Sequence, residues 1–205
     1  MSLSRYARFT TVGVATTYEA SSRNGLVGGS LIRIIGGTRV AGPATTALCG
    51  VDDNLAVHRV LETVRPGDVV VVTTPGPCSV ALVGELLALQ AKARGAAGLL
   101  IDGAVRDVDE LVALGLPIWA RSIVAAGAAK DEPGALGLPV VVGGAPIEPG
   151  DVVVLDGDGA VVVPRVRADE VLVAAEVRRQ HELALAVRLE AGELTLDAMQ
   201  LRGSW

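Results

Sequence analysis

Residues 69–107 read VVVVTTPGPCSVALVGELLALQAKARGAAGLLIDGAVRD, and this stretch decides the fold. It begins with Val69–Thr74, a continuous β-branched run that is typical of a strand buried on both faces. Pro75–Ser79 forms a loop, and a helix then ends at Gly95, just after the basic residues of its last turn. Leu99–Asp102 is a second buried strand. A strand, a helix and a strand at this spacing predict a right-handed crossover and therefore an α/β fold.

The same alternation of strands and helices continues on both sides of this unit. A shorter helix, Asp107–Leu114, and a strand, Pro117–Ile123, follow it. Before it, Ile32–Leu48 contains Gly-Gly and Gly-Pro breaks that predict two strands and a turn. Asp52–Val64 has apolar residues at helical spacing. The chain opens with a predicted helix around Val14–Asn24.

Short Val-rich strands fill much of the last third of the chain. The predicted strands are Val140–Val142, Val152–Leu155 and Ala160–Val163. They are separated by Gly-Gly, Pro-Gly-Asp and Asp-Gly-Asp-Gly, which are typical of turns between antiparallel strands. The segment that begins at Asp156 lacks the downstream glutamate of a calcium loop, so we interpret it as a hairpin turn. We therefore expect a mixed central sheet with flanking helices and a long C-terminal helix, Ala168–Glu190.

The composition excludes several functional classes. Among 205 residues, 50% are hydrophobic and 2% aromatic, so the core must consist of Val, Leu, Ile and Ala, and we expect a single domain over residues 1–205. The net charge is −5 and there is no run of Lys or Arg, which argues against nucleic-acid binding. No apolar stretch approaches the ~20 residues that span a bilayer, so we expect no membrane partner.

Two further features bear on location and redox state. The N-terminal residues MSLSRYARFTT lack the apolar region of a signal peptide, which predicts a cytoplasmic protein. Cys49 and Cys78 lie far apart and outside any Cys-x-x-Cys, so we expect two reduced thiols.

The segment that starts at Gly84 is the first candidate for a binding site. A helix that begins there leaves the backbone amides of Glu85, Leu86 and Leu87 unpaired, and the helix dipole makes that position favourable for an anion. Gly84 has no Cβ to keep a ligand away from the backbone. The alternative is an ordinary helix start with an acidic residue in its first turn.

Arg106 and Asp107 follow a predicted buried strand, at the kind of strand end where ligands bind in α/β sheets. An arginine there can bind a carboxylate with two hydrogen bonds or stabilise an enolate, although a surface ion pair is a common alternative. Asp107 and Glu110 have the spacing of a helix capping box. Asp107 is also a candidate ligand for Mg²⁺, which commonly takes one or two protein carboxylates and keeps its waters.

Other candidates are weaker on sequence grounds. Glu19 could enter a site but is better placed in the first helix. Asp53 and Asn54, with His58 four positions after Asn54, could line a pocket, although a single histidine is usually structural.

Nearly the whole chain resembles the RraA-like family, which includes the regulator of ribonuclease E activity A. The resemblance rests on the pattern of an acid, twenty residues and Arg-Asp in Gly84–Asp107, and on phrases in the same order along the chain: GVATTYEA, Asp53-Asn54 with His58, TPGPC, ARSIVAAGAAK, LPVVVGGAPIEPGD and DGDGAVVVP. The metal-dependent branch comprises class II pyruvate aldolases acting on 4-hydroxy-4-methyl-2-oxoglutarate and 4-carboxy-4-hydroxy-2-oxoadipate. The resemblance implies a swivelling β/β/α domain, a homotrimer or homohexamer, and sites near subunit contacts.

By this resemblance the chain is a carbon-carbon lyase with a small 2-oxo acid as its substrate. It implies that Gly84–Leu87 bind the pyruvate part, that Arg106 binds substrate and stabilises the enolate, and that Asp107 anchors Mg²⁺ or Mn²⁺ through water. Glu85 stands where the aldolases usually have aspartate, near a water that relays a proton. Because loss of CO₂ from oxaloacetate gives the same enolate, the resemblance also implies oxaloacetate decarboxylase activity.

Two other functions are compatible with the resemblance. The chain could be a non-catalytic regulator that binds a ribonuclease, but such a protein has no need of the carboxylate of Asp107. Some relatives are labelled menaquinone methyltransferases, but no glycine-rich loop for a methyl donor follows the first strand.

Overall fold

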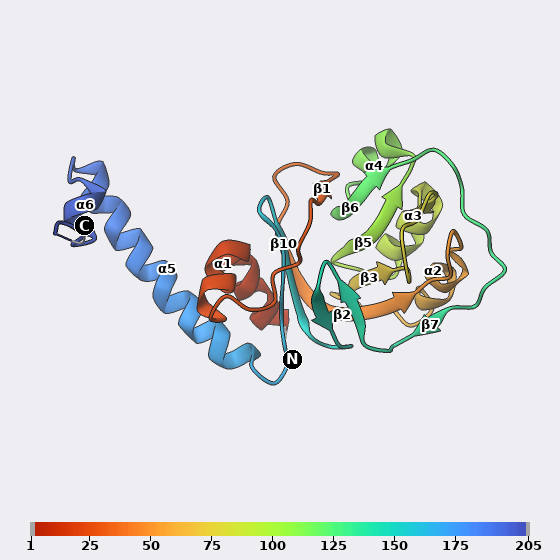
Figure 1. Cartoon of the computed structure of the whole chain (residues 1–205), viewed down its shortest axis with the longest axis horizontal. Coiled ribbons are helices and arrows are strands. Elements are labelled where there is room, and N and C mark those ends of the chain that lie inside the picture. The colour runs from red at the N-terminus through yellow and green to blue at the C-terminus, as the bar shows by residue number, and fades with distance from the viewer. Residues whose placement is uncertain (1–2, 204–205) are drawn as a thin grey trace.

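A computed structural model describes residues 3–203. Its main sheet has nine strands, and the central four run parallel in the order β6, β5, β3, β2 (Figure 1). They comprise β2 (Val40–Leu48), β3 (Val69–Thr73), β5 (Gly98–Val105) and β6 (Ile118–Ile123). Because β3 pairs in parallel with β5 and a helix lies between them in the sequence, the predicted strand–helix–strand unit is confirmed.

Antiparallel strands extend the sheet at both edges, so the predicted mixed sheet is also confirmed. Added strands are β1 (Ile32–Arg33) beside β6, β7 (Ala135–Leu136) and β10 (Val152–Asp156) beside β2, and β11 (Gly159–Val163) beside β10. The predicted turn at Asp156 joins β10 to β11. A separate hairpin is formed by β8 (Val140–Val142) and β9 (Ala145–Ile147).

Three helices cover one face of the parallel strands: α2 (Leu55–Val60), α3 (Glu85–Ala93) and α4 (Val108–Leu114) (Figure 1). The valines of β3 are buried on both faces of the sheet, which explains the continuous run of four. Val70 and Val72 pack with these helices, whereas Val69 and Val71 point to the opposite face. That second face packs against the β8–β9 hairpin and the inner face of β10 and β11, so the sheet curls back on itself.

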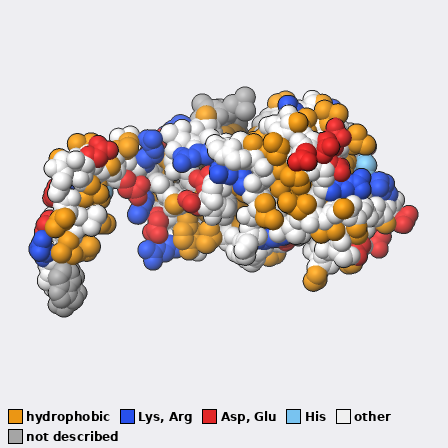
Figure 2. Space-filling model, turned by 90° about the horizontal axis from the view of Figure 1, so that it is seen from above, with side chains coloured by type: hydrophobic (Ala, Val, Ile, Leu, Met, Phe, Trp, Pro, Cys, Tyr) orange, Lys and Arg blue, Asp and Glu red, His pale blue; other side chains and the backbone are white. Residues whose placement is uncertain are grey.

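The outer face of β10 and β11 is covered by α1 (Leu3–Ala20) and the first part of α5 (Ala168–Glu190). The helix α5 contacts α1 as far as Glu182, whose Oε2 accepts the Thr16 hydroxyl at 3.5 Å. Beyond Glu182 it leaves the body, and with α6 (Thr195–Ala198) it forms a projecting arm, residues 183–203 (Figure 1). Figure 2 shows hydrophobic side chains along this arm. None of the helices within residues 3–203 combines the length and the apolar character that a membrane crossing requires.

Several predicted boundaries are wrong. The first helix, α1, is broken at Gly13, so its second part begins at Val14 as predicted, but it ends at Ala20 rather than Asn24, and the part that begins at Leu3 was not predicted. Residues 21–24 form a turn in which Ser22 and Arg23 have positive φ. The helix predicted over Asp52–Val64 is only six residues long. The strand β4 (Ala81–Val83) lies in a segment for which we predicted no strand, and it pairs with the end of β5. The two thiols, Cys49 and Cys78, are free as predicted.

Candidate functional site

The strands β4 and β5 bring the two halves of the candidate site together. They run parallel, so their carboxyl ends meet: Gly84 follows β4, and Arg106 and Asp107 follow β5. The backbone N–H of Arg106 donates to the carbonyl of Val83 at 3.0 Å and extends the pairing to this point. The residues that the sequence pattern linked across twenty positions are therefore neighbours.

Gly84 is needed for space rather than for backbone conformation. Its φ of −132° and ψ of −167° are extended values that any residue can adopt. A Cβ atom at this position would lie 2.4 Å from Oδ2 of Asp107 and 3.0 Å from Cγ of Arg106. Gly127 is similar, because a Cβ there would lie 2.8 Å from Nη1 of Arg106. The two glycines therefore let the arginine and aspartate lie directly against the backbone.

The capping role predicted for Asp107 is wrong. Asp107 precedes α4, but its side chain makes no capping hydrogen bond, and its backbone is left-handed with φ of 58°. Its Oδ2 instead accepts the backbone N–H of Glu85 at 3.1 Å and lies 3.4 Å from Nε of Arg106. A non-glycine residue in this conformation typically costs ~1–3 kcal/mol, and such residues gather at functional sites.

This contact also changes the prediction for the start of α3. The N–H of Glu85 is occupied by Asp107 and is not free. Within residues 3–203, the amides of Leu86 and Leu87 have no hydrogen-bond acceptor, so two of the three expected amides remain available to an anion.

Arg106, Asp107 and the start of α3 border one cavity of about 120 Å³. At ~30 Å³ per water, this is room for about four water molecules, so a six- or seven-carbon acid would extend out of the cavity. Its wall comes from five segments of the chain and consists of Asn54, His58, Ala81, Gly84, Leu86, Leu87, Arg106, Asp107, Gly127, Ala128 and Lys130.

The start of α2 contributes two polar side chains to this wall. Asn54 is 6% exposed, and its Nδ2 donates to the carbonyl of Leu82 at 2.9 Å. Its Oδ1 is buried without a hydrogen-bond partner, and so is Nε2 of His58. The sequence-based suggestion that these two residues line a pocket is confirmed.

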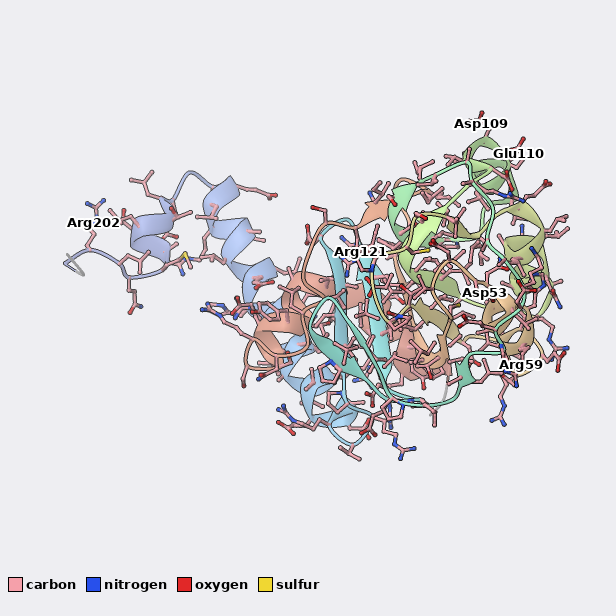
Figure 3. The ribbon with its side chains drawn as sticks, turned by 45° about the vertical axis from the view of Figure 1, so that its right-hand side comes forward. Asp53, Arg59, Asp109, Glu110, Arg121 and Arg202 are labelled. Carbon is pink, nitrogen blue, oxygen red and sulfur yellow. The ribbon has the colours of Figure 1, made fainter. Side chains whose placement is uncertain are left out.

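Asp53 holds the start of α2 against the loop that carries Lys130. Its carboxylate accepts backbone N–H groups of Leu55 at 2.8 Å, Asp131 at 2.6 Å and Glu132 at 3.1 Å (Figure 3). Burial opposes ionisation of this carboxyl, but the three amide hydrogen bonds outweigh burial and lower the pKa of Asp53 below its usual value. Asp53 therefore supports the cavity wall without lining it.

The side chains of several other predicted or charged residues do not line the cavity. The Glu85 side chain is exposed and does not line the wall. Glu19 lies in the first helix, as expected, and pairs with Arg23 at 3.2 Å. Glu110 is exposed on α4 (Figure 3). Arg121 donates to Oδ1 of Asp102 at 2.7 Å and to the carbonyl of Gly28 at 2.8 Å, so its role is structural.

Sequence reasoning missed the loop after β6 as part of the site. Gly127, Ala128 and Lys130 border the cavity, and Nζ of Lys130 has only a long contact of 3.3 Å with the carbonyl of Ala128 among the described residues. The one available signal was a glycine followed closely by a lysine just beyond a strand end, which is too common to identify a site.

A larger hollow of about 820 Å³ lies elsewhere, between α1 and the turn before β3. Asp68 lies in its wall, but its Oδ2 already accepts the Thr45 hydroxyl at 2.7 Å and the Arg65 amide at 2.9 Å. Because the smaller cavity contains the unpartnered polar atoms, we assign the candidate site to it.

A divalent cation at this site would have few protein ligands. Residues 3–203 contain no group of three or more His, Cys, Asp or Glu side chains placed to hold a metal. Asp107 lines a cavity wide enough for water, and its Oδ1 has no hydrogen-bond partner among residues 3–203. One carboxylate plus waters and substrate oxygens is a normal set for Mg²⁺. The residues therefore fit a hydrated cation, but not a dehydrated one.

Comparison with known proteins identifies the family. The RraA-like family model, described as Aldolase/RraA, matches residues 12–162. The chain belongs to the RraA-like family. A relative from Halalkalibacterium halodurans, named "Putative 4-hydroxy-4-methyl-2-oxoglutarate aldolase", is 38% identical over 146 residues, which cover 71% of this chain and 70% of the relative. The matched range includes every residue that lines the cavity.

Solved structures confirm the expected RraA-like fold. RraAS2 from Streptomyces coelicolor, described as an unusual member of the RNase ES inhibitor RraA protein family, is 34% identical with a TM-score of 0.80, covering 89% of this chain and 95% of that chain. A protein of unassigned function from Pseudomonas syringae is 28% identical with a TM-score of 0.87, covering 98% of this chain and 95% of that chain. The latter match extends over the arm.

Proposed function

We propose that the protein is a divalent-metal-dependent class II pyruvate aldolase. It would cleave 4-hydroxy-4-methyl-2-oxoglutarate or 4-carboxy-4-hydroxy-2-oxoadipate to pyruvate and a second keto acid, with oxaloacetate decarboxylase activity in addition. The observation that supports this most is the meeting of Arg106, Asp107 and the start of α3 around one small cavity. The relative named as an aldolase supports the same branch of the family.

The pyruvate part of the substrate is proposed to lie between α3 and Arg106. Its carboxylate would accept the free amides of Leu86 and Leu87, where the helix dipole favours an anion. The guanidinium of Arg106, 45% exposed along its side chain, would face the keto oxygen that becomes the enolate. Lys130 at the loop would face a second carboxylate that extends out of the cavity.

Asp107 would hold Mg²⁺ or Mn²⁺ through water, with Oδ1 as the available oxygen. A bound cation would supply Lewis-acid stabilisation of the enolate. The protein itself contributes the positive charge of Arg106, which Gly84 and Gly127 keep against the backbone before substrate arrives. A preorganised charge of this kind needs no reorganisation during the reaction.

Cleavage removes one proton from the substrate and breaks one carbon–carbon bond. The C4 hydroxyl loses its proton and becomes the carbonyl of the second keto acid, the C3–C4 bond breaks, and its electrons form the pyruvate enolate beside Arg106. Protonation of the enolate at C3 gives pyruvate. A water near Glu85 is proposed to relay protons to bulk solvent, because this carboxylate lies at the exposed end of α3.

The test measures pyruvate release from 4-carboxy-4-hydroxy-2-oxoadipate and from oxaloacetate, with and without EDTA. We expect EDTA to abolish both activities and added Mg²⁺ or Mn²⁺ to restore them. Arg106→Ala and Asp107→Ala should each lower kcat by ~10²–10³. Arg94→Ala is the matched control, because Arg94 caps the far end of α3 and donates to the carbonyl of Glu62 at 3.0 Å. Full activity in EDTA, or in Arg106→Ala, would refute the proposal.

A protein-binding role is the second candidate, supported by the description of the Streptomyces relative as belonging to a ribonuclease inhibitor family. A pull-down with a ribonuclease, beside the pyruvate assay, separates the two. A binding regulator would retain its partner in the Asp107→Ala variant and would release no pyruvate from any substrate.

We also propose that the chain forms a homotrimer or a pair of trimers. The arm supports self-association, because it exposes several apolar side chains, among them Leu183, Val187, Leu194 and Met199. Exposed apolar surface often marks an interaction site. Analytical ultracentrifugation of the full chain would give the mass, and a monomer at micromolar concentration would contradict the proposal.

A further inference from the structure

Two buried polar atoms in the cavity wall have no partner within the described residues: Oδ1 of Asn54 and Nε2 of His58. Buried polar side-chain atoms in folded proteins are nearly always hydrogen-bonded, and an exception calls for an explanation. Both atoms belong to the first turns of α2, and both residues line the same cavity as Arg106 and Asp107. A ligand in this cavity is the natural partner for both.

The hydrogen-bond network decides which chemistry Asn54 can recognise. Its Nδ2 donates to the carbonyl of Leu82 at 2.9 Å, and this bond fixes the orientation of the amide. The free atom is therefore the oxygen, which can only accept. A carboxylate or keto oxygen has no hydrogen to offer it. A ligand hydroxyl does.

Nε2 of His58 adds a second acceptor in the neutral imidazole that carries its hydrogen on Nδ1. Arg106 and Lys130 supply positive charge in the same wall, and they can bind the carboxylate groups of a ligand. Asn54 and His58 are therefore not needed to bind those carboxylates. The wall is thus divided into a cationic part for carboxylate and enolate oxygens and an accepting part for a hydroxyl.

We propose that Asn54 and His58 receive the C4 hydroxyl of the substrate, with Oδ1 of Asn54 accepting its hydrogen bond on binding and Nε2 of His58 taking its proton during cleavage. The inference rests on the proposed function and names residues that it leaves unassigned. A hydroxyl hydrogen can rotate from one acceptor to the other without movement of the substrate.

The bond changes balance as follows. The O–H bond breaks and an N–H bond forms at His58, the oxygen electrons form the new carbonyl, and the C3–C4 electrons pass to the pyruvate enolate. The proton on His58 then goes to C3 of the enolate or to solvent, which restores the neutral imidazole. No oxidant or reductant is required.

Oxaloacetate provides an internal control for this assignment. Its keto form has no hydroxyl group. Loss of CO₂ from it produces the same enolate, and no hydroxyl has to be deprotonated. The Asn54–His58 pair should therefore be needed for aldol cleavage and dispensable for decarboxylation, whereas Arg106 should be needed for both.

The experiment compares the two reactions in His58→Gln and Asn54→Ala, with Arg106→Ala as the variant expected to lose both. We expect kcat/KM for 4-carboxy-4-hydroxy-2-oxoadipate to fall ~10²-fold or more in His58→Gln, the usual contribution of a general base. In Asn54→Ala it should fall about tenfold, as for one lost hydrogen bond. For oxaloacetate decarboxylation, kcat/KM of both variants should stay within about threefold of the wild type. A change of that size is smaller than the loss expected from a missing general base or a missing hydrogen bond.

Binding of oxalate, an enolate mimic without a hydroxyl group, shows whether the cavity is intact. Calorimetry should give unchanged affinity in both variants, and thermal melting should show that they are folded. Equal loss of both reactions, or no loss of aldol cleavage, in folded variants that bind oxalate would overturn the inference and leave the aldolase proposal standing. A wild-type protein that releases no pyruvate from a 4-hydroxy acid would overturn both.

Discussion

Replacing Asp53 by asparagine would test how the two sides of the cavity are held together. Asp53 is 2% exposed and links the start of α2 to the loop that carries Lys130. The variant keeps the size of the side chain but replaces one carboxylate oxygen with an NH₂ group. That group then faces the backbone N–H of Leu55, or those of Asp131 and Glu132, and two donors cannot bond to each other.

The expected cost follows from these contacts. A hydrogen bond to a charged group contributes ~1.5–3 kcal/mol, and the asparagine loses at least one bond and weakens the others. We expect a loss of about 3 kcal/mol in the free energy of unfolding. For a chain of this size, each kcal/mol lowers Tm by ~2–4 °C, so Tm should fall by about 6–12 °C.

The pH dependence gives a second readout. The folded state lowers the pKa of Asp53, so the stability from its carboxylate is present above its unfolded pKa of about 4 and is lost as pH falls through the lower folded pKa. The difference in Tm between wild type and variant should therefore shrink on acidification.

Thermal unfolding from neutral to acidic pH measures both effects, with Asp109→Asn as the control. Asp109 is exposed on α4, so its replacement should change the free energy of unfolding by no more than ~0.5 kcal/mol (Figure 3). An Asp53→Asn variant with the Tm of the wild type, or a difference that grows in acid, would refute the reasoning.

Three further predictions concern the core. Burial raises the pKa of the Cys49 thiol to about 12, so iodoacetamide at about pH 8 should alkylate Cys49 only after unfolding; mass spectrometry showing rapid modification of the native protein would contradict this. Gly13→Ala should lower the free energy of unfolding in urea by ~1–2 kcal/mol or more, because Gly13 has a φ of +79° and a Cβ there would lie 2.7 Å from Oδ2 of Asp156; an unchanged urea midpoint would show that the chain adjusts. Trp119→Phe should cost ~1–3 kcal/mol beyond its packing change, because the buried Nε1 donates to the carbonyl of Asp156 at 2.9 Å and that carbonyl would lose its donor; a calorimetric scan with equal Tm would count against this.

The parts of the fold that could be predicted are those with a repeated local cause. Val69–Thr73 is buried at every position because both faces of β3 are covered, and this gives a continuous apolar run that sequence alone reveals. The strand β4 has three residues, too few for a pattern, and it exists because it pairs with β5. The part of α1 before Gly13 was not predicted, because the two parts are joined at a break where Asp156, distant in sequence, accepts the N–H of Val14.

The candidate site shows the same division. Arg106 could be placed at a strand end because the pattern of β5 precedes it. The orientation of the Asp107 side chain could not be predicted. The same Asp-x-x-Glu sequence is compatible with an aspartate that caps α4 and with a left-handed aspartate that binds the start of α3, and the structure has the second. Lys130 lies in a loop without periodicity, so its place at the cavity depends on contacts such as those of Asp53 that only the folded chain makes.

Buried aspartates that accept backbone amides recur wherever loops meet in this protein. Asp53 binds the loop after β6, Asp151 accepts the amides of Glu148 and Arg165, and Asp156 accepts that of Val14. A chain with very few aromatic side chains has limited means of anchoring loops by packing, and charged acceptors provide directional bonds instead. Asp107, although exposed, does the same with its Oδ2, which accepts the N–H of Glu85 at the start of α3. This one bond therefore fixes both the start of α3 and the carboxylate that we propose as a metal ligand.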